Sequence, residues 1–236
     1  MHMVVETISV FEHSVQRDID VVLIVYIYTG PRSTMQTINI AVLGAPAVGK
    51  SSIIQQYKDC IFTRQHFPTK STSTYTSVVL ANQHLYQLNI IDSTPLQYFK
   101  KRSFYDWVDF QSYSNDITDA AAFIIVFDVS IGDSFQHVKD LREQILDYRE
   151  CNGHELPIVV AANKCDLGKC TELSKRDIAH IVRKNWKSGY VECSAKYNWH
   201  IVSLFGEVVR LISDARDRPS TTRMRGSLQR NSCIIM

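Results

Sequence analysis

The apolar residues of the chain fall into short continuous runs and into longer segments with helical spacing. Residues 37–43, 121–127 and 157–162 are runs of mainly apolar side chains, and such runs predict strands that are buried on both faces. Residues 78–80 and 85–91 are separated by only four residues, which predicts a hairpin.

Two segments repeat apolar residues three and four positions apart, the spacing that places side chains on one face of a helix. These residues are Phe135, Val138, Leu141 and Ile145 in the first segment and Ile201, Leu204, Phe205, Val208 and Ile212 in the second. Strands that alternate with helices, with one early hairpin, predict an α/β domain over residues 37–213. We expect a mainly parallel six-stranded sheet with helices on both faces.

The amino-acid composition indicates a folded domain and disfavours one class of partner, nucleic acids. The chain has 236 residues, of which 45% are hydrophobic and 21% charged, and this excludes a disordered or fibrous chain. Lysine and arginine total 26 and the acids total 24, so the net charge is only +2 and no nucleic-acid partner is expected. The six cysteines form no dense framework, so we expect reduced thiols.

Both ends of the chain differ from the domain. Residues 1–36 are interpreted as an N-terminal extension of unknown role. Its apolar run at 21–28 is too short to cross a bilayer, which takes about 20 residues in a helix. Residues 214–236 carry five arginines and two aspartates and lack apolar periodicity, which predicts a flexible basic tail.

A phosphate-binding motif directly follows the first predicted strand. Residues 44–51 match G-x-x-x-x-G-K-[ST] at every fixed position, between a strand and a helical pattern as the motif requires. In such a loop, backbone N–H groups and a helix N-terminus face the phosphates, Lys50 neutralises the β- and γ-oxygens, and Ser51 binds magnesium. The predicted phosphate-binding residues are Gly44, Ala45, Pro46, Ala47, Val48, Gly49, Lys50, Ser51 and Ser52.

Two further motifs indicate which base is bound. Asn163-Lys164-Cys165-Asp166 follows the strand at 157–162, at the sheet edge where such folds bind ligands. The Asp166 carboxylate can accept hydrogen bonds from N1–H and the exocyclic amine of guanine, a pair of donors that adenine lacks. Ser194-Ala195-Lys196 follows another predicted strand and can supply a backbone N–H to the guanine carbonyl. A P-loop kinase or ATPase is the alternative, but it leaves Asp166 unexplained.

These residues resemble the Ras superfamily of small guanine-nucleotide-binding proteins, over about residues 37–213. The resemblance implies that Thr69, which lies 19 residues after Lys50, binds magnesium and the γ-phosphate in the GTP state. It also implies that Phe62 stacks against the guanine and that Asp92 holds magnesium through water. For Phe62, packing in the core is the alternative. The implied cofactor is Mg²⁺, with GTP or GDP as the bound ligand.

The segment after Asp92 departs from the Ras pattern. Pro95 and Leu96 stand where Ras-like proteins have glycine and glutamine. Proline has no N–H for the γ-phosphate and leucine cannot orient a water molecule, so we expect slow GTP hydrolysis and assign no catalytic residue. Gln97 lies one residue too late for the glutamine role. Pro46, inside the phosphate loop, has no backbone N–H to donate to a phosphate, and its ring crowds the space that an arginine finger needs.

A closer resemblance is to a divergent Ras-like branch, member ten of the Ras-like protein family. It is carried by residues 190–201, the glycine-free segment after Asp92 and the ending Cys233-Ile234-Ile235-Met236. That ending fits C-a-a-X, so Cys233 is expected to carry a prenyl group. One lipid gives weak attachment, and the arginines of the tail are the expected second signal on an anionic membrane. The expected location is the cytoplasmic face of the plasma membrane, with a nuclear pool left open by the basic tail.

The sequence therefore predicts a Ras-like GTPase that acts as a membrane-attached signalling switch with unidentified effectors and regulators. The alternative is a GTP-loaded interaction module that hardly hydrolyses its nucleotide. Single-turnover hydrolysis, measured with and without candidate activators, separates these two functions.

Overall fold

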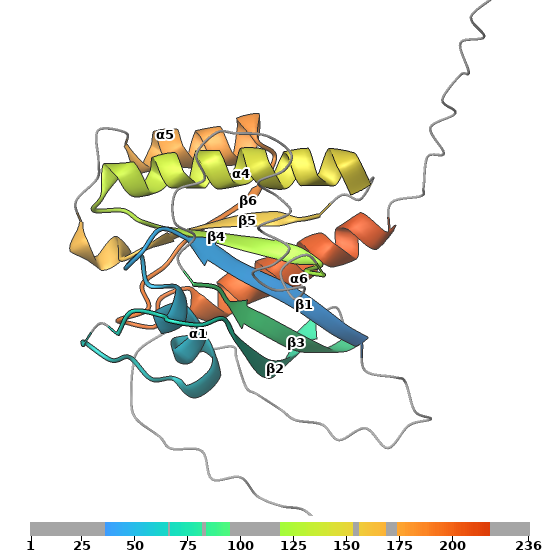
Figure 1. Ribbon diagram of the computed structural model, residues 1–236, viewed down its shortest axis with the longest axis horizontal. Helices are drawn as coiled ribbons and strands as arrows, with labels where there is room; N and C mark the ends of the chain where they lie inside the picture. The colour runs from blue at the N-terminus through green and yellow to red at the C-terminus, as the bar shows by residue number, and fades with distance from the viewer. Residues whose placement is uncertain are drawn as a thin grey trace, which may run out of the picture. The chain divides into compact units, whose positions relative to one another are not determined.

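A sheet forms the centre of the domain in the computed structural model, and six of its strands lie within the described residues (Figure 1). The structure describes residues 36–65, 67–81, 84–94, 119–152, 156–168 and 174–217. The strands are β1 Gln36–Gly44, β2 Ser73–Ala81, β3 His84–Asp92, β4 Ala122–Asp128, β5 Ile158–Asn163 and β6 Gly189–Glu192. They lie in the order β2-β3-β1-β4-β5-β6, with β2 and β3 antiparallel and the other four neighbouring pairs parallel.

Helices cover both faces of this sheet. The helical segments are α1 Lys50–Asp59, α4 Gly132–Asn152, the 3-10 turn η1 Cys165–Leu167, α5 Lys175–His180, the π-helical turn η2 Ile181–Asn185 and α6 Ile201–Asp217. Figure 1 shows α1 and α6 on one side of the sheet and α4 and α5 on the other. A separate apolar cluster fills each interface. The predicted architecture, a mainly parallel sheet with helices on both faces, is confirmed.

The continuous apolar runs are the central strands. Every residue of β4 and β5 is buried, because these strands have a neighbouring strand on each side and helices on both faces. Strand β2 lies at an edge, where Tyr75 and Val79 pack against the cluster under α1 and α6 while Thr74 and Thr76 are exposed. The hairpin is confirmed, but β2 begins at Ser73, five residues earlier than predicted. Its polar and β-branched residues suit an edge strand without forming an apolar run.

Two helical regions differ from the predictions. Helix α5 and the turn η2 have no counterpart among the predicted elements, although Ser174 marks their start by accepting a hydrogen bond from the Asp177 N–H at 3.2 Å. Helix α6 continues to Asp217, four residues past the predicted boundary at Ser213. Arg210 supports this extra turn by donating to the Asp214 carboxylate at 2.6 Å. The flexible tail predicted from residue 214 is thus corrected, since its first four residues are helical.

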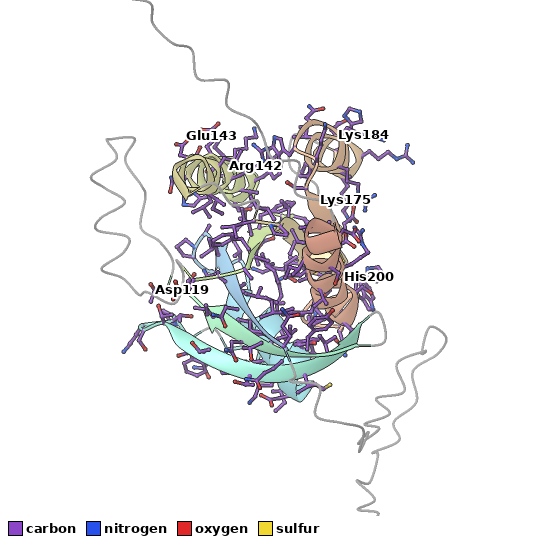
Figure 2. All side chains as sticks on the ribbon, turned by 90° about the vertical axis from the view of Figure 1, so that its right-hand side faces the viewer. Asp119, Arg142, Glu143, Lys175, Lys184 and His200 are labelled. Atoms are coloured by element: carbon purple, nitrogen blue, oxygen red, sulfur yellow. The ribbon has the colours of Figure 1, made fainter. Side chains whose placement is uncertain are left out.

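Helix α4 and the segment that contains α5 and η2 lie together over one face of the sheet. The rings of Phe135 and Trp186 stack at 5.8 Å between their centroids and join the two segments. Figure 2 shows Lys184 on one of these helices and Arg142 on the other. Residues 1–35 of the predicted N-terminal extension and residues 218–236 lie outside the described residues, whereas Gln36, the last residue of that predicted extension, is the first residue of β1. Within the described ranges, no helix is long and apolar enough to cross a membrane.

Candidate nucleotide-binding site

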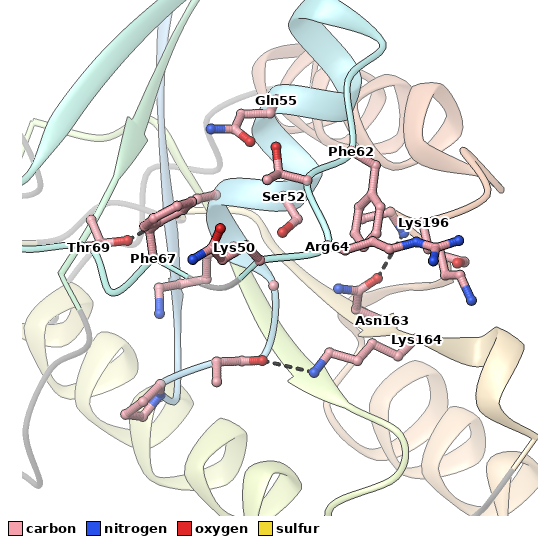
Figure 3. Close-up of a pocket in the computed structure, with 18 of the residues that line it drawn as sticks. Lys50, Ser52, Gln55, Phe62, Arg64, Phe67, Thr69, Asn163, Lys164 and Lys196 are labelled. Atoms are coloured by element: carbon pink, nitrogen blue, oxygen red, sulfur yellow. Dashed lines mark hydrogen bonds between the residues drawn. The ribbon is translucent and has the colours of Figure 1, made fainter.

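A cavity of about 790 Å³ lies where the parallel strands end (Figure 3). Its walls come from the loop after β1, the segment after α1 and the loops after β5 and β6. The predicted residues that line it are Pro46, Ala47, Gly49, Lys50, Ser51, Ser52, Phe62, Thr69, Asn163, Lys164, Asp166, Ser194, Ala195 and Lys196. The other predicted residues, Gly44, Ala45, Val48 and Asp92, are buried and do not line it. The fold thus joins the phosphate and base motifs in one cavity.

The phosphate loop needs glycine at both of its fixed positions. At Gly44, φ is 145° and a Cβ would lie 2.3 Å from the carbonyl oxygen of Val126, so no side chain fits. At Gly49, φ is 98° and a Cβ would lie 2.3 Å from Nδ2 of Asn163. Glycine at both positions therefore allows the loop to lie close against β4 and against the base loop.

Lys50 begins α1 and points back over the phosphate loop. Only 5% of the residue is exposed, and its ammonium donates hydrogen bonds to the carbonyl oxygens of Gly44 and Ala45, both at 3.0 Å. Burial lowers the pKa of Lys50 to about 8, and the charge of Asp92 partly offsets this effect. A bound polyphosphate would bring further negative charge to this buried cation and raise its pKa again.

Asn163 ends β5 and links the phosphate loop to the second base loop. Its Nδ2 donates to the Val48 carbonyl at 2.9 Å, and its Oδ1 accepts from the Ala195 N–H at 3.1 Å. The residue is 1% exposed, so it positions two loops. Because the Ala195 N–H already donates to Asn163, a guanine carbonyl would have to share this donor.

Lys164 is held between the phosphate loop and a buried acid. Its ammonium donates to the Ala47 carbonyl at 2.9 Å and lies 2.6 Å from Oδ2 of Asp128. Oδ1 of Asp128 accepts from the N–H and the hydroxyl of Ser130, at 2.9 and 2.6 Å. Burial alone would raise the pKa of Asp128, but the hydrogen bonds from Lys164 and Ser130 outweigh it, so this pKa lies below its ordinary value.

Asp128 is absent from the predicted site. It ends β4, a strand that is otherwise entirely apolar, at the same sheet edge as the base motif. A polar residue in that position is the sequence signal that could have identified it, because ligands bind at the carboxyl ends of parallel strands. Asp128 acts through Lys164, so we regard it as a positioning residue.

The proposed guanine reader, Asp166, lies in η1 at the cavity wall. The buried Ser194 hydroxyl donates to its Oδ1 at 2.6 Å and fixes the carboxylate in place. A carboxylate has about four acceptor positions, so this bond leaves room for two donors from a base. The Cys165 N–H donates to the Cys193 carbonyl at 3.2 Å, which joins the two base loops through their backbones.

The three predicted magnesium ligands lie together. The hydroxyl oxygens of Ser51 and Thr69 are 3.0 Å apart. Asp92 is 2% exposed, and its Oδ1 has no hydrogen-bond partner within the described part of the structure. Burial raises the pKa of Asp92, while a hydrogen bond from Ser51 and the charge of Lys50 act in the opposite direction. An unpaired, buried carboxylate oxygen beside two hydroxyls fits a hard divalent cation, which prefers oxygen ligands.

Comparison with known proteins decides the family. The sequence model of the Ras family matches residues 39–214. This chain belongs to the Ras family. It is 39% identical over 204 residues to human Ras-like protein family member 10B, covering 86% of this chain and 100% of that protein. It is also 39% identical over 209 residues to mouse Ras-like protein family member 10A, covering 85% and 98%. To the GTP-binding protein Di-Ras2 of Macaca fascicularis it is 29% identical over 203 residues, covering 84% and 96%.

Both resemblances noted in the sequence, to the Ras superfamily and to its member-ten branch, are confirmed. As a member of the Ras family, this protein is a guanine-nucleotide-binding small GTPase. The predicted phosphate and base motifs lie together in one cavity of this Ras-family protein.

The segment between α1 and β2 contributes more to this Ras-family site than the motifs predict. Phe62 lines the cavity, as a guanine-stacking residue must, and also packs against the cluster under α1 and α6. The lining residues that were not predicted are Gln55, Thr63, Arg64, Gln65, Phe67, Pro68 and Leu167. These positions follow no fixed residue pattern, so only the path of the chain reveals them.

Some predicted features of this Ras-family protein lie outside the described residues. They include Pro95, Leu96 and Gln97 after β3, and the prenylation residue Cys233. What was inferred from these residues about hydrolysis and membrane attachment stays a prediction.

Proposed function

We propose that this Ras-family protein is a magnesium-dependent, membrane-attached switch that alternates between GTP and GDP. The observation that carries the proposal is a single cavity lined by both Lys50 and Asp166. Asn163, from the first base motif, is hydrogen-bonded both to the phosphate loop and to the second base motif. A phosphate loop alone serves many nucleotides. Its combination with an anchored carboxylate at the base position favours guanine.

Base selection tests the assignment of Asp166. Asp166→Asn replaces one acceptor with a donor, which should weaken GTP and GDP binding and improve the binding of xanthine nucleotides. The lost charge-assisted pairing is worth about 1.5–3 kcal/mol, or roughly a 10- to 150-fold weaker affinity. Asp177→Asn, on exposed α5, is the control and should bind GTP normally. Unchanged GTP affinity in Asp166→Asn removes Asp166 from the site, and displacement of GTP by ATP favours the kinase or ATPase alternative.

Magnesium is the proposed cofactor. The hydroxyls of Ser51 and Thr69 would hold the ion, and Asp92 would hold it through water; a bound Mg²⁺ neutralises phosphate charge. Chelation should accelerate release of GDP from the parent protein, and Asp92→Asn should make release less sensitive to the chelator. Identical release rates with and without the chelator in the parent would contradict a magnesium site.

Slow GTP hydrolysis is the proposed consequence of Pro95 and Leu96. Phosphoryl transfer depends on positioning water and stabilising charge, and these residues can do neither in the way that glycine and glutamine do. The double substitution Pro95→Gly with Leu96→Gln should raise the single-turnover rate. If it does not, with nucleotide and magnesium fully bound in both proteins, these residues are not the limiting defect. Hydrolysis absent from the parent even with activators would favour the GTP-loaded interaction module.

Membrane attachment is proposed to depend on Cys233 and on the arginines of the tail. Prenylation supplies one weak anchor, and basic residues near an anionic leaflet supply the second. Cys233→Ser should move the protein from the membrane to the soluble fraction of cells, while replacement of the five arginines should do so partially. Persistence of the Cys233→Ser protein on membranes would count against the lipid anchor.

A further inference from the structure

The segment 174–188, which contains α5 and η2, carries a strong excess of positive charge. It has a single acid, Asp177, whose carboxylate accepts a hydrogen bond from the Ser174 hydroxyl at 2.7 Å. Its five cations are Lys175, Arg176, Arg183, Lys184 and Lys187, of which all but the half-buried Lys175 are exposed. We call these five side chains the basic ridge.

The basic ridge is the outer face of an amphipathic segment that is fixed to the domain. Ile178 and Val182 are buried in the cluster under α4, and Trp186 packs against that cluster. Arg176 lies in α5, Lys184 in η2 and Lys187 just after η2, and all three side chains are exposed. Because apolar packing holds the inner face, these charges keep a fixed direction relative to the rest of the domain.

Positive charge is concentrated on this segment. On α4, the described side chains include four acids (Asp133, Asp140, Glu143 and Asp147) and two bases (Lys139 and Arg142). On α6, Arg210 is paired with both Glu207 and Asp214, at 2.7 and 2.6 Å. Among their described side chains, neither neighbouring helix therefore extends the basic surface. An electrostatic partner would meet this domain at the ridge.

One end of the basic ridge lies next to the helix from which the tail leaves. Gly189, two residues after Lys187, packs so closely on α6 that a Cβ there would lie 3.1 Å from Leu211 and 3.4 Å from Glu207. Helix α6 ends at Asp217, and the arginines of residues 218–230 follow in the sequence. The segment that carries the ridge thus leads into a residue that packs against α6, the helix that the basic tail follows in the sequence.

We propose that the basic ridge is a second contact with an anionic lipid surface, which fixes how the domain is oriented on the membrane. The proposal rests on the membrane attachment proposed above. Basic residues near an anionic leaflet are attracted to it, and rigid ones also determine which face turns toward it. Strand β6, next to η2, would face the membrane, and the edge strand β2 at the other end of the sheet would stay open to protein partners.

The surface of the segment favours lipid headgroups over an acidic protein. Protein interfaces generally bury an apolar centre surrounded by a polar rim. The large hydrophobic side chains that are exposed in the described residues all lie outside 174–188. A row of cations without exposed apolar residues suits a charged surface of lipid headgroups, and further arginines follow α6 in the sequence.

Vesicle binding of the full-length, unprenylated, GDP-loaded protein tests the proposal. Vesicles of phosphatidylcholine mixed with phosphatidylserine are compared with vesicles of phosphatidylcholine alone. The ridge variant carries Arg176→Gln, Lys184→Gln and Lys187→Gln. Arg183 is left in place because it donates to the Tyr190 carbonyl at 3.1 Å. The control variant carries Lys58→Gln and Lys70→Gln, at cations in α1 and in the segment after it, and it is matched in net charge by the ridge double variant Lys184→Gln with Lys187→Gln.

The ridge variant should bind anionic vesicles on the order of 100-fold more weakly than the parent, since each cation contributes roughly fivefold. The control variant should bind them almost as well as the parent. Equal weakening in the control variant and in the matched ridge double variant overturns the proposal, because net charge or the tail then explains binding, and so does an absence of parent binding to anionic vesicles. Ridge-dependent binding to polyglutamate but not to vesicles overturns it in favour of an acidic protein.

Two further measurements show whether each protein is folded and whether it retains GDP. Thermal unfolding of each variant shows whether it is folded, and the three single substitutions, each expected to weaken binding roughly fivefold, replace the triple variant if it is not. GDP retention is measured in the same samples. Loss of nucleotide by the parent would contradict the proposed switch function but would leave the vesicle comparison intact.

Discussion

Replacing Gly49 by alanine tests whether the phosphate loop and the base loops form one mechanical unit. The backbone at Gly49 has φ of 98°, and an alanine Cβ would lie 2.3 Å from Nδ2 of Asn163. Asn163 cannot move aside freely, because it bonds both the Val48 carbonyl and the Ala195 N–H. We therefore expect the added methyl group to displace Asn163 and to disturb both loops.

The expected losses of stability and of GDP affinity follow from these contacts. A left-handed backbone is unfavourable for alanine by about 1–2 kcal/mol. Each hydrogen bond that Asn163 loses is worth about 0.5–1.5 kcal/mol. The free energy of unfolding should thus fall by about 2–5 kcal/mol. The part due to the two hydrogen bonds, about 1–3 kcal/mol, acts within the nucleotide site and should weaken GDP binding by roughly 5- to 150-fold.

The assay is titration with a fluorescent GDP analogue, together with thermal unfolding of the nucleotide-free protein. Gly168→Ala is the matched control, because Gly168 also has a left-handed φ, of 64°, but nothing lies within 4 Å of its Cβ position. Gly168→Ala should lower the free energy of unfolding only by the cost of the left-handed backbone, about 1–2 kcal/mol, and should leave GDP affinity unchanged. Asn163→Ala should weaken GDP binding without the backbone term. Combined with Gly49→Ala, it should add little further loss of GDP affinity, since both changes remove the same bonds.

A Gly49→Ala protein that binds GDP as the parent does, and loses no more stability than Gly168→Ala, would refute the coupling of the two loops through Asn163. Fully additive losses of GDP affinity in the double variant would likewise show that Gly49 and Asn163 act independently.

Three further predictions concern charges and hydrogen bonds in the site. Asp128→Asn should lower the free energy of unfolding by about 1.5–3 kcal/mol. Because the native pKa of Asp128 lies below 3.8, its stabilisation is lost only as the pH falls through that native pKa, so urea unfolding at about pH 5 and pH 8 should show the same loss. The pKa of Lys50 is about 8 in the fold and 10.5 ordinarily, so the unfolded chain binds more protons between these values. The free energy of unfolding of the nucleotide-free protein should therefore rise with pH over that range, and the Lys50 contribution to this rise should be missing from Lys50→Met. Ser194→Ala should speed GDP dissociation by roughly 10-fold or more, measured by stopped flow, because Asp166 loses a charge-assisted hydrogen bond.

The local features of this protein follow from the sequence alone. The central strands appear as apolar runs because both of their faces are buried, and the phosphate loop appears as a motif because its glycines and Lys50 are neighbours in the chain. The proposed guanine-reading carboxylate, Asp166, is found for the same reason, since a contiguous tetrapeptide carries it. Strand β2 begins earlier than its apolar residues indicate, because an edge strand has one exposed face and so lacks a continuous apolar run.

Only the tertiary structure decides which distant residues work together. Asp128 supports Lys164, and Asn163 ties two loops together, because the carboxyl ends of β4 and β5 meet beside the phosphate loop. These pairings depend on strand order and register, which place residues more than 30 positions apart within hydrogen-bonding distance and which no local spacing encodes. The basic ridge is of the same kind. Its charges are visible in the sequence, but whether they form one outward face depends on Ile178 and Trp186 packing inward against the sheet and α4.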